Sequence, residues 1–172
     1  LRLAEIAPSQ HDAKRSEFLE AWPYSPVLMQ LLEDQVLVAT EAQETRDLIR
    51  ILVDLFKTRG EQSPVITAAD FDISNEKGSV TSLLNSVSNN VHRTLLQKAQ
   101  RNIEAARTAV QNPDTNVPHT SDIISALWLR SLSVDRINGA EPAELQCDIT
   151  RGTPVDDNTF AAEMALIREN SF

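Results

Sequence analysis

Apolar residues recur at intervals of three and four along residues 88–111, and this spacing constrains the fold more than any other feature of the sequence. Such a spacing places the side chains along one side of an α-helix. The chain has only 4 Gly and 5% aromatic residues in 172 positions, which disfavours turn-rich β-sandwiches and barrels. The sequence therefore predicts a mostly α-helical protein with one domain or two small ones. The apolar positions of this segment are Val91, Leu95, Leu96, Ala99, Ile103, Ala106 and Val110.

Helix boundaries are predicted at several points before this segment. Ser9 can cap a first helix, and Ser25 followed by Pro26 is typical of the start of a second one. A third helix is predicted over residues 41–59, with Gly60 directly after its last turn. We expect one face of the third helix to be buried, and its apolar residues are Leu48, Ile49, Leu52, Val53 and Phe56.

Residues 67–74 carry two overlapping signals. Thr67 and Asp70 match a capping box in which Asp replaces the usual Glu, and this pattern predicts a short helix. Asp70, Asp72 and Ser74 also follow the spacing at the start of a calcium-binding loop. The Gly and Glu that such a loop requires further along are absent, so a helix cap is the favoured interpretation.

A two-domain organisation is predicted from the proline-containing segment 112–120, which includes Pro113 and Pro118. Residues 1–111 would form a helical bundle. Residues 121–172 show the order helix, turn, short helix, turn, helix, which matches a winged-helix module without its wing and with little or no strand. The final helix is expected over residues 156–169.

The cellular setting is suggested by what the composition lacks. The single Cys147 allows no internal disulfide, and we expect it to be a small buried residue of a cytoplasmic protein. No apolar run approaches the roughly 20 residues needed to span a bilayer, so no membrane partner is expected. The chain starts at Leu1 and stops at Phe172 within what reads as running sequence, so we expect a fragment of a larger protein.

No complete catalytic site is predicted in the chain. A phosphate-binding loop of the form G-x-x-x-x-G-K-[ST] does not occur, which argues against an autonomous ATPase. His11, His92 and His119 lie far apart and have no second ligand at helical spacing, so no metal site is expected. Whether the chain takes part in an enzyme therefore stays open at this point.

The predicted long helix is basic, although the whole chain has a net charge of −9. Arg93, Lys98, Arg101 and Arg107 oppose the single acid Glu104. This helix could meet nucleic acid or an acidic neighbouring domain, or it could simply present a solvated face.

The predicted winged-helix module is a poor candidate for binding DNA. Residues 121–172 contain nine acidic residues and four arginines. Asp156 and Asp157 begin the helix that would read DNA, so carboxylates would face the phosphates. We therefore favour a packing role for this module, and DNA remains possible only for a larger parent protein.

Several short motifs resemble the region that follows the ATPase core in large bacterial and archaeal AAA-plus ATPases, often described only as domains of unknown function and found at phage-defence loci. The resemblance covers most of the chain, and its motifs are short. Ser25 stands where these proteins usually carry His. The segments that carry the resemblance are 22–26 (WPYSP), 43–50 (QETRDLIR), 125–132 (SALWLRSL), 139–140 (GA) and 144–145 (EL).

The resemblance implies a function for the segment as a helical lid plus winged-helix module. The lid would close over nucleotide bound by the protein's own upstream ATPase core, with ATP and Mg as cofactors of that parent and none held by the fragment. Arg46 occupies the position of the sensor arginine, and Arg50 lies one turn later. A guanidinium can hold a phosphate bidentately and stabilise charge during phosphoryl transfer. Other protein subunits are expected as partners.

Three alternatives stay open. Arg46 can instead form an ordinary surface ion pair with Glu41, Glu44 or Asp47. The chain can be a winged-helix DNA-binding module of a regulator, or a plain helical scaffold for protein contacts. A phosphate-binding loop in the sequence upstream would favour the AAA-plus lid over both the DNA-binding module and the scaffold.

Overall fold

The computed structural model describes residues 7–33, 44–86, 90–132 and 139–171, and these residues are mostly helical, as the sequence predicts. Residues 60–78, between α3 and α4, form the longest connection that is described throughout, and within it Ile66 forms an isolated parallel bridge with Tyr24. The α-helices are α1 (His11–Ala21), α2 (Pro26–Leu31), α3 (Glu44–Arg59), α4 (Ser79–Ser86), α5 (Asn90–Thr108), α6 (Pro113–Asn116), α7 (Thr120–Arg130), α8 (Pro142–Ile149) and α9 (Asp157–Asn170). Two 3₁₀ turns are η2 (Pro8–Gln10) and η4 (Ala68–Asp70).

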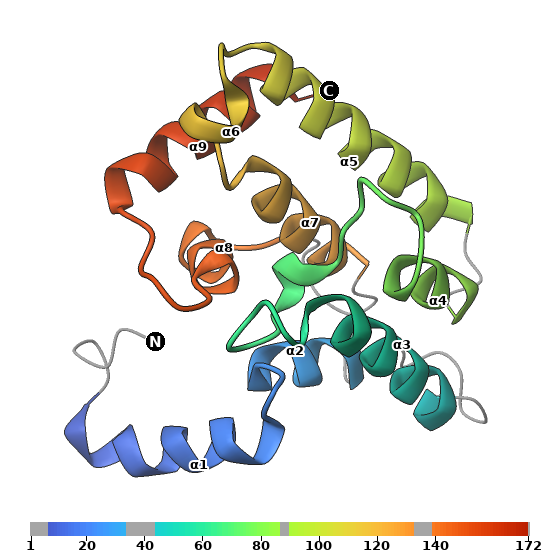
Figure 1. Ribbon diagram of the computed structural model, residues 1–172, viewed down its shortest axis with the longest axis vertical. Helices are drawn as coiled ribbons and strands as arrows, with labels where there is room; N and C mark the ends of the chain where they lie inside the picture. The colour runs from blue at the N-terminus through green and yellow to red at the C-terminus, as the bar shows by residue number, and fades with distance from the viewer. Residues whose placement is uncertain (1–6, 34–43, 87–89, 133–138, 172) are drawn as a thin grey trace.

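Helix α7 lies in the middle of the molecule and packs against α5, α8, α9 and η4 (Figure 1). Its sequence explains this position, because apolar residues cover most of its circumference and a helix that is apolar all round must be buried. Ile123 and Leu129 are almost completely buried. Trp128 packs against Phe71, with the two ring centroids 6.4 Å apart and the ring planes at 58°.

Two of the predicted caps are confirmed. The Ser25 hydroxyl accepts a hydrogen bond from the Leu28 N–H, and Pro26 begins α2. Thr67 and Asp70 form the predicted capping box at η4, with the Asp70 carboxylate 2.8 Å from the Thr67 backbone nitrogen. A cap rather than a calcium loop is thus the observed role of Asp70.

Two local expectations, for Ser9 and Cys147, are wrong, and a third, for Gly60, is confirmed. Ser9 does not cap α1, because η2 precedes that helix and places Gln10 at the cap position, without a side-chain hydrogen bond. Cys147 is exposed rather than buried, because α8 packs on α7 through Leu145 on another side of the helix. Gly60 directly follows the last residue of α3, as predicted, and its N–H bonds to the Phe56 carbonyl at 2.8 Å, although its φ is not positive.

The segment predicted as a linker contains the short helix α6 and two buried residues, Val117 and Thr120. Helix α5, from the first predicted domain, packs on α7 and α9 from the second. The buried apolar residues on both sides of residues 112–120 form one cluster. The division into two domains therefore stays a prediction, and packing across its boundary is extensive.

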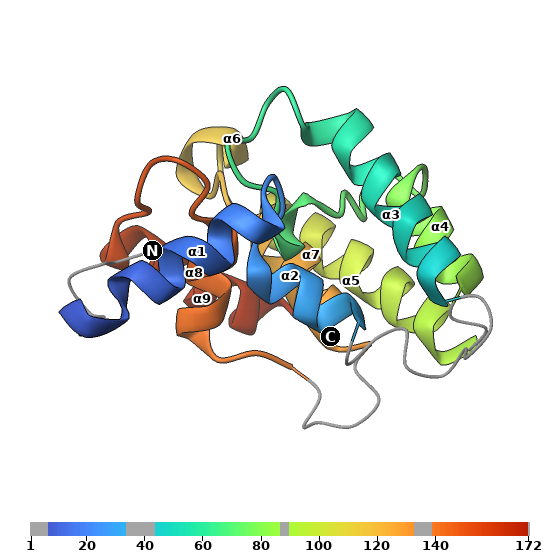
Figure 2. The same ribbon diagram turned by 90° about the horizontal axis from the view of Figure 1, so that it is seen from below.

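Helices α1, α2 and α3 form the part of the molecule farthest from α5 and α9. Figure 2 shows α1 at the near face with α2 beside it. Helix α1 makes its main contacts with α2 and η2, and none of its residues is buried. Among the described residues, no helix combines the length and the apolar character needed to cross a membrane.

Candidate interaction surface

Helix α3 carries apolar residues on more than half of its circumference, and only part of this surface is covered. Ile51 and Leu55 are completely buried, whereas Leu48 and Leu52 are half-buried. The sequence-based expectation that one face would bury Ile49, Val53 and Phe56 is wrong. Their side chains are 56%, 42% and 50% exposed.

The uncovered residues of α3 form a single surface, which we call the α3 stripe. At about 100° per residue, positions 46, 49, 50, 53, 56 and 57 fall within one third of the helix circumference. This third faces away from Ile51 and Leu55. The α3 stripe therefore combines three apolar and three cationic side chains: Arg46, Ile49, Arg50, Val53, Phe56 and Lys57.

The orientation of α3 is fixed by contacts on its other sides. The Tyr24 hydroxyl donates a hydrogen bond to the Leu52 carbonyl at 2.7 Å, which joins the start of α2 to the edge of α3. On another side, the Ser82 hydroxyl of α4 donates to the Asp54 carboxylate at 2.6 Å. These bonds act on both flanks of α3 and favour the orientation in which the stripe is exposed.

The Phe56 ring lies close to Gly60, which directly follows α3. A methyl group added at Gly60 would lie 2.7 Å from the Phe56 ring and 2.7 Å from its carbonyl oxygen. The glycine thus lets the chain pass beneath the ring. The ring stays half-exposed at the end of the stripe, so this aromatic side chain is presented to solvent by the local backbone.

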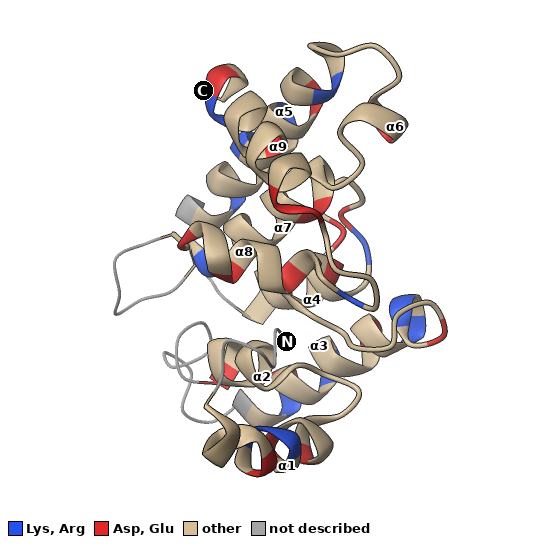
Figure 3. Ribbon diagram, turned by 90° about the vertical axis from the view of Figure 1, so that its left-hand side faces the viewer, with Lys and Arg blue, Asp and Glu red and all other residues tan. Residues whose placement is uncertain are grey.

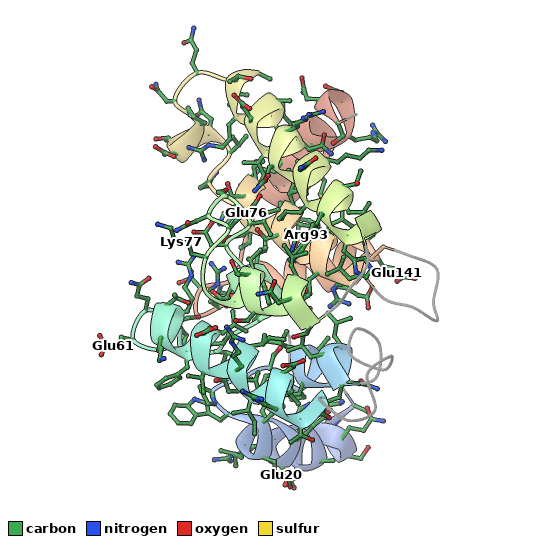
Figure 4. All side chains as sticks on the ribbon, turned by 90° about the vertical axis from the view of Figure 1, so that its right-hand side faces the viewer. Glu20, Glu61, Glu76, Lys77, Arg93 and Glu141 are labelled. Atoms are coloured by element: carbon green, nitrogen blue, oxygen red, sulfur yellow. The ribbon has the colours of Figure 1, made fainter. Side chains whose placement is uncertain are left out.

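Exposed apolar side chains are concentrated in α1 to α3. Six large apolar residues are exposed in the described part of the chain, and none of them belongs to α4–α9. Leu19 and Trp22 are 70% and 68% exposed. Charged residues lie along the same helices (Figure 3), and Figure 4 shows Glu20 on α1 and Glu61 beyond α3. The exposed apolar residues of the α3 stripe, with cationic residues beside them, are typical of a protein interaction site.

Both predicted site residues lie on this surface. Arg46 and Arg50 are exposed on successive turns of α3, so the structure places them on the same side of the helix. Neither forms an ion pair with another described side chain, and Asp47 does not pair with Arg46. Glu41 and the side chain of Glu44, the other predicted partners, lie outside the described residues.

A buried polar network, absent from the sequence-based predictions, lies in the other half of the molecule. The Asp70 side chain is 1% exposed, and the Arg151 Nε lies 3.1 Å from its Oδ1. Arg151 also bonds to Asp122 at 2.7 Å and donates to the Ala69 carbonyl at 3.1 Å. Burial raises the pKa of Asp70 despite the two nearby arginines, Arg151 and Arg59, which lower it.

A second buried ion pair adjoins the first. The Arg130 Nε donates to the Asp148 Oδ2 at 2.8 Å, and both side chains are more than nine-tenths buried. Arg130 reaches Glu144 at 3.2 Å as well. Thr67 connects the two pairs, because its hydroxyl donates to the Asp148 carbonyl oxygen while its N–H donates to Asp70. Burial raises the pKa of Asp148, against the lowering effect of Arg130.

Glu163 is the third buried acid that sequence reasoning missed. Its side chain is completely buried in α9 and accepts hydrogen bonds from the start of α7. The His119 N–H and the Thr120 hydroxyl each lie 3.0 Å from its Oε2, and the His119 Nδ1 lies 2.8 Å from its Oε1. The carboxylate therefore caps α7 from a distant part of the chain.

These three clusters link elements of the fold to one another. Asp70 and Asp148 each pair with an arginine, and Glu163 accepts hydrogen bonds from N–H and hydroxyl groups. Together these contacts connect α7, α8, α9 and η4. No group of three His, Cys, Asp or Glu suited to a metal ion exists among the described residues. Their clearest role is structural.

The predicted DNA-reading helix begins with its own carboxylate cap. Asp156 accepts hydrogen bonds from the N–H groups of Asn158 and Thr159, each at 3.0 Å. Phe160 and Ile167 face the protein interior. Helices α7, α8 and α9 follow the predicted helix–turn–helix order, while their identity as a winged-helix module stays a prediction.

Comparison with known proteins adds no family to this description. No family model matches the chain, and neither the curated proteins nor the solved structures contain a significant match. The α3 stripe is therefore interpreted from its own chemistry.

Proposed function

We propose that the chain is a non-catalytic helical segment of a larger, cytoplasmic AAA-plus ATPase, in which it serves as the lid over the nucleotide-binding core and carries a winged-helix interaction module. In this proposal the α3 stripe docks on the upstream core, and Arg46 approaches the γ-phosphate of ATP. The segment then reports the nucleotide state to other protein subunits by moving with the core.

The observation that carries the proposal is the combination of exposed apolar side chains and exposed arginines on one side of α3. Ile49, Val53 and Phe56 supply area for burial against a protein surface. Arg46 and Arg50 suit an anionic group at the margin of that surface, because a guanidinium matches the oxygens of a phosphate. A lid that closes over a nucleotide needs both properties in one place.

The chemistry assigned to this chain is limited to its own residues. Bound ATP would supply the phosphoryl group and the upstream core would hold its Mg, since the chain lacks a phosphate-binding loop. Arg46 would contribute a charge-stabilising donor, and Arg50 would add positive potential one turn away. The apolar residues of the stripe would exclude water from the contact.

The second candidate is a helical scaffold that binds another protein without any nucleotide. The same exposed apolar residues support it, because they require only an apolar partner surface. The two candidates differ in the role of the arginines. A DNA-binding function is less favoured, because the carboxylate of Asp156 already occupies the N-terminus of α9.

The test is ATP hydrolysis by the full-length polypeptide carrying Arg46→Ala. Loss of one charge-stabilising donor is expected to lower turnover by roughly ten- to a thousandfold. Arg50→Ala should have a smaller effect, being one turn further along α3. Arg15→Ala on α1 is the matched control, because it removes another exposed arginine from the same half of the chain.

Melting temperatures separate a chemical effect from a folding effect. All three arginines are exposed, so each variant should melt close to the unmodified protein. Unchanged hydrolysis in a folded Arg46→Ala protein would reject the sensor role and leave the scaffold as the better function.

A further inference from the structure

The basic helix α5 keeps most of its cations exposed after folding. Arg93, Lys98 and Arg101 are exposed and make no ion pair with another described side chain. Only Arg107 is neutralised locally, by Asp114 at 2.5 Å. Figure 3 shows basic residues along α5, and Figure 4 labels Arg93 on this helix. The helix is a positive surface on a chain of net charge −9.

A hollow of about 690 Å³ lies against the outer face of α5. The inner face of the helix is buried through Leu96, Ala99 and Ile103, so the hollow lies on the opposite, solvent side. Its lining combines two cations, one acid, two polar side chains and one methyl group: Lys98, Arg101, Glu104, Asn102, Thr108 and Ala105.

We propose that this hollow on α5 binds an acidic peptide segment in an extended conformation, supplied by a partner protein. Residues 98–108 extend over about 15 Å of helix, which corresponds to four or five extended residues. Lys98 and Arg101 lie at one end and attract carboxylates. The Thr108 hydroxyl donates to the Glu104 and Ala105 carbonyls of its own helix, and its oxygen can still accept a hydrogen bond from a peptide N–H. This site is separate from the α3 stripe and does not depend on the proposed lid function.

The lining favours a peptide over nucleic acid. No aromatic side chain is among the described residues that line the hollow, so bases have no described surface on which to stack. Glu104 lies among the cations and would repel the closely spaced phosphates of a nucleic acid. A peptide has carboxylates at wider intervals and can place a backbone N–H or a hydroxyl opposite Glu104. Charge complementarity and local chemistry thus point to the same occupant.

The experiment is fluorescence anisotropy with the whole chain and a fluorescein-labelled ten-residue peptide that alternates Glu with Ala and Ser. Binding in the tens of micromolar range is expected at about 50 mM salt, weakening as salt rises. Three further probes test specificity: the same peptide with Gln in place of Glu, a single-stranded DNA 20-mer and a DNA duplex. The Gln peptide should bind at least tenfold more weakly.

Paired charge reversals locate the site. Lys98→Glu with Arg101→Glu should weaken the acidic peptide at least tenfold. Lys14→Glu with Arg15→Glu is the matched control, because it changes the net charge equally at exposed positions on α1, outside the α3 stripe, and it should weaken binding less than threefold. Far-ultraviolet circular dichroism confirms that each variant is folded, and Lys98→Gln with Arg101→Gln replaces the first pair if it is not.

Several results would overturn the proposal. Equal weakening by both pairs would mean that only the overall charge matters. Equal binding of the Glu and Gln peptides would show that the hollow does not recognise the negative charge of the peptide. DNA binding that is tighter than peptide binding and is lost with Lys98 and Arg101 would make the hollow a nucleic-acid site. If the acidic peptide does not bind at concentrations up to about 1 mM, the hollow is not a binding site for acidic peptides.

Discussion

Two regions of this molecule differ in whether the side chains that can interact are paired within the chain or exposed to solvent. Around α7, buried acids have matched partners, as the pairs Arg130–Asp148 and Arg151–Asp70 show. In α1 to α3, large apolar side chains and arginines of the same chain remain exposed. The first region pairs its buried acids within the chain, whereas the second leaves apolar and cationic side chains exposed. The comparison separates residues that hold the fold from residues available for function.

The largest effect should follow from breaking the Arg130–Asp148 pair. Arg130→Ala leaves the Asp148 carboxylate buried without its cation, and the loss of a partner in a buried pair costs about 3–5 kcal/mol of unfolding free energy. Urea denaturation followed by circular dichroism measures the change. Arg107→Ala is the control, because its partner Asp114 has an 89% exposed side chain and such surface pairs contribute about 0–1 kcal/mol. Equal losses in the two variants would show that the Arg130 pair behaves as a surface pair.

A smaller loss is expected when Glu163 becomes Gln. The Gln oxygen can keep the bonds from the His119 N–H and the Thr120 hydroxyl at the Oε2 position, but the amide NH₂ then replaces the oxygen that lies 2.8 Å from the His119 Nδ1, so the charge and one acceptor are lost. The expected cost is about 1–3 kcal/mol of unfolding free energy. Glu169→Gln on the exposed part of the same helix should change it by less than about 0.5 kcal/mol. If Glu163→Gln is as stable as Glu169→Gln, the carboxylate does not hold α9 on α7.

The pH dependence of Asp70 has a definite sign. Burial raises its pKa in the folded protein, so its contribution to stability is fully present below the ordinary pKa of an aspartate and is lost as pH rises through the folded value. Asp70→Asn removes this dependence. The stability of the unmodified chain relative to Asp70→Asn should therefore decrease from about pH 4 to pH 7. Urea titrations at several pH values measure it, with Asp12→Asn as an exposed control. An increase over this range would mean that the arginines outweigh burial.

Sequence reasoning succeeded where the signal was local. The Ser25–Pro26 cap and the Thr67–Asp70 box lie within a few residues, so their side-chain chemistry can be read directly from the chain. The buried acids could not be predicted in this way. Glu163 meets its partners across 43 and 44 positions, and no local pattern distinguishes it from an exposed helix acid.

The α3 stripe shows a different limit of sequence reasoning. The sequence shows that α3 is apolar on a broad arc, but periodicity alone cannot say which part of a broad arc is covered. The answer depends on α4, which approaches Asp54 through Ser82, and on Tyr24, which bonds to Leu52. Arg46 and Arg50 were correctly placed together on one helix, and their role in binding nucleotide stays a prediction.

The smallest effect on stability is expected for substitutions in the α3 stripe. They test whether the exposed region, unlike the region around α7, contributes little to folding. Ile49→Gln combined with Val53→Gln removes two exposed apolar side chains, which should change the unfolding free energy by less than about 1 kcal/mol. Ile51→Ala on the same helix is the matched control, because Ile51 is completely buried and its truncation should cost about 2–5 kcal/mol. Urea denaturation of the isolated chain supplies both values.

A loss in the double variant as large as that of Ile51→Ala would mean that the chain itself covers the stripe. A double variant with an unchanged unfolding free energy but a lower ATP turnover in the full-length polypeptide would assign the exposed residues to docking rather than to folding. Their removal would then affect only the contact with the partner surface.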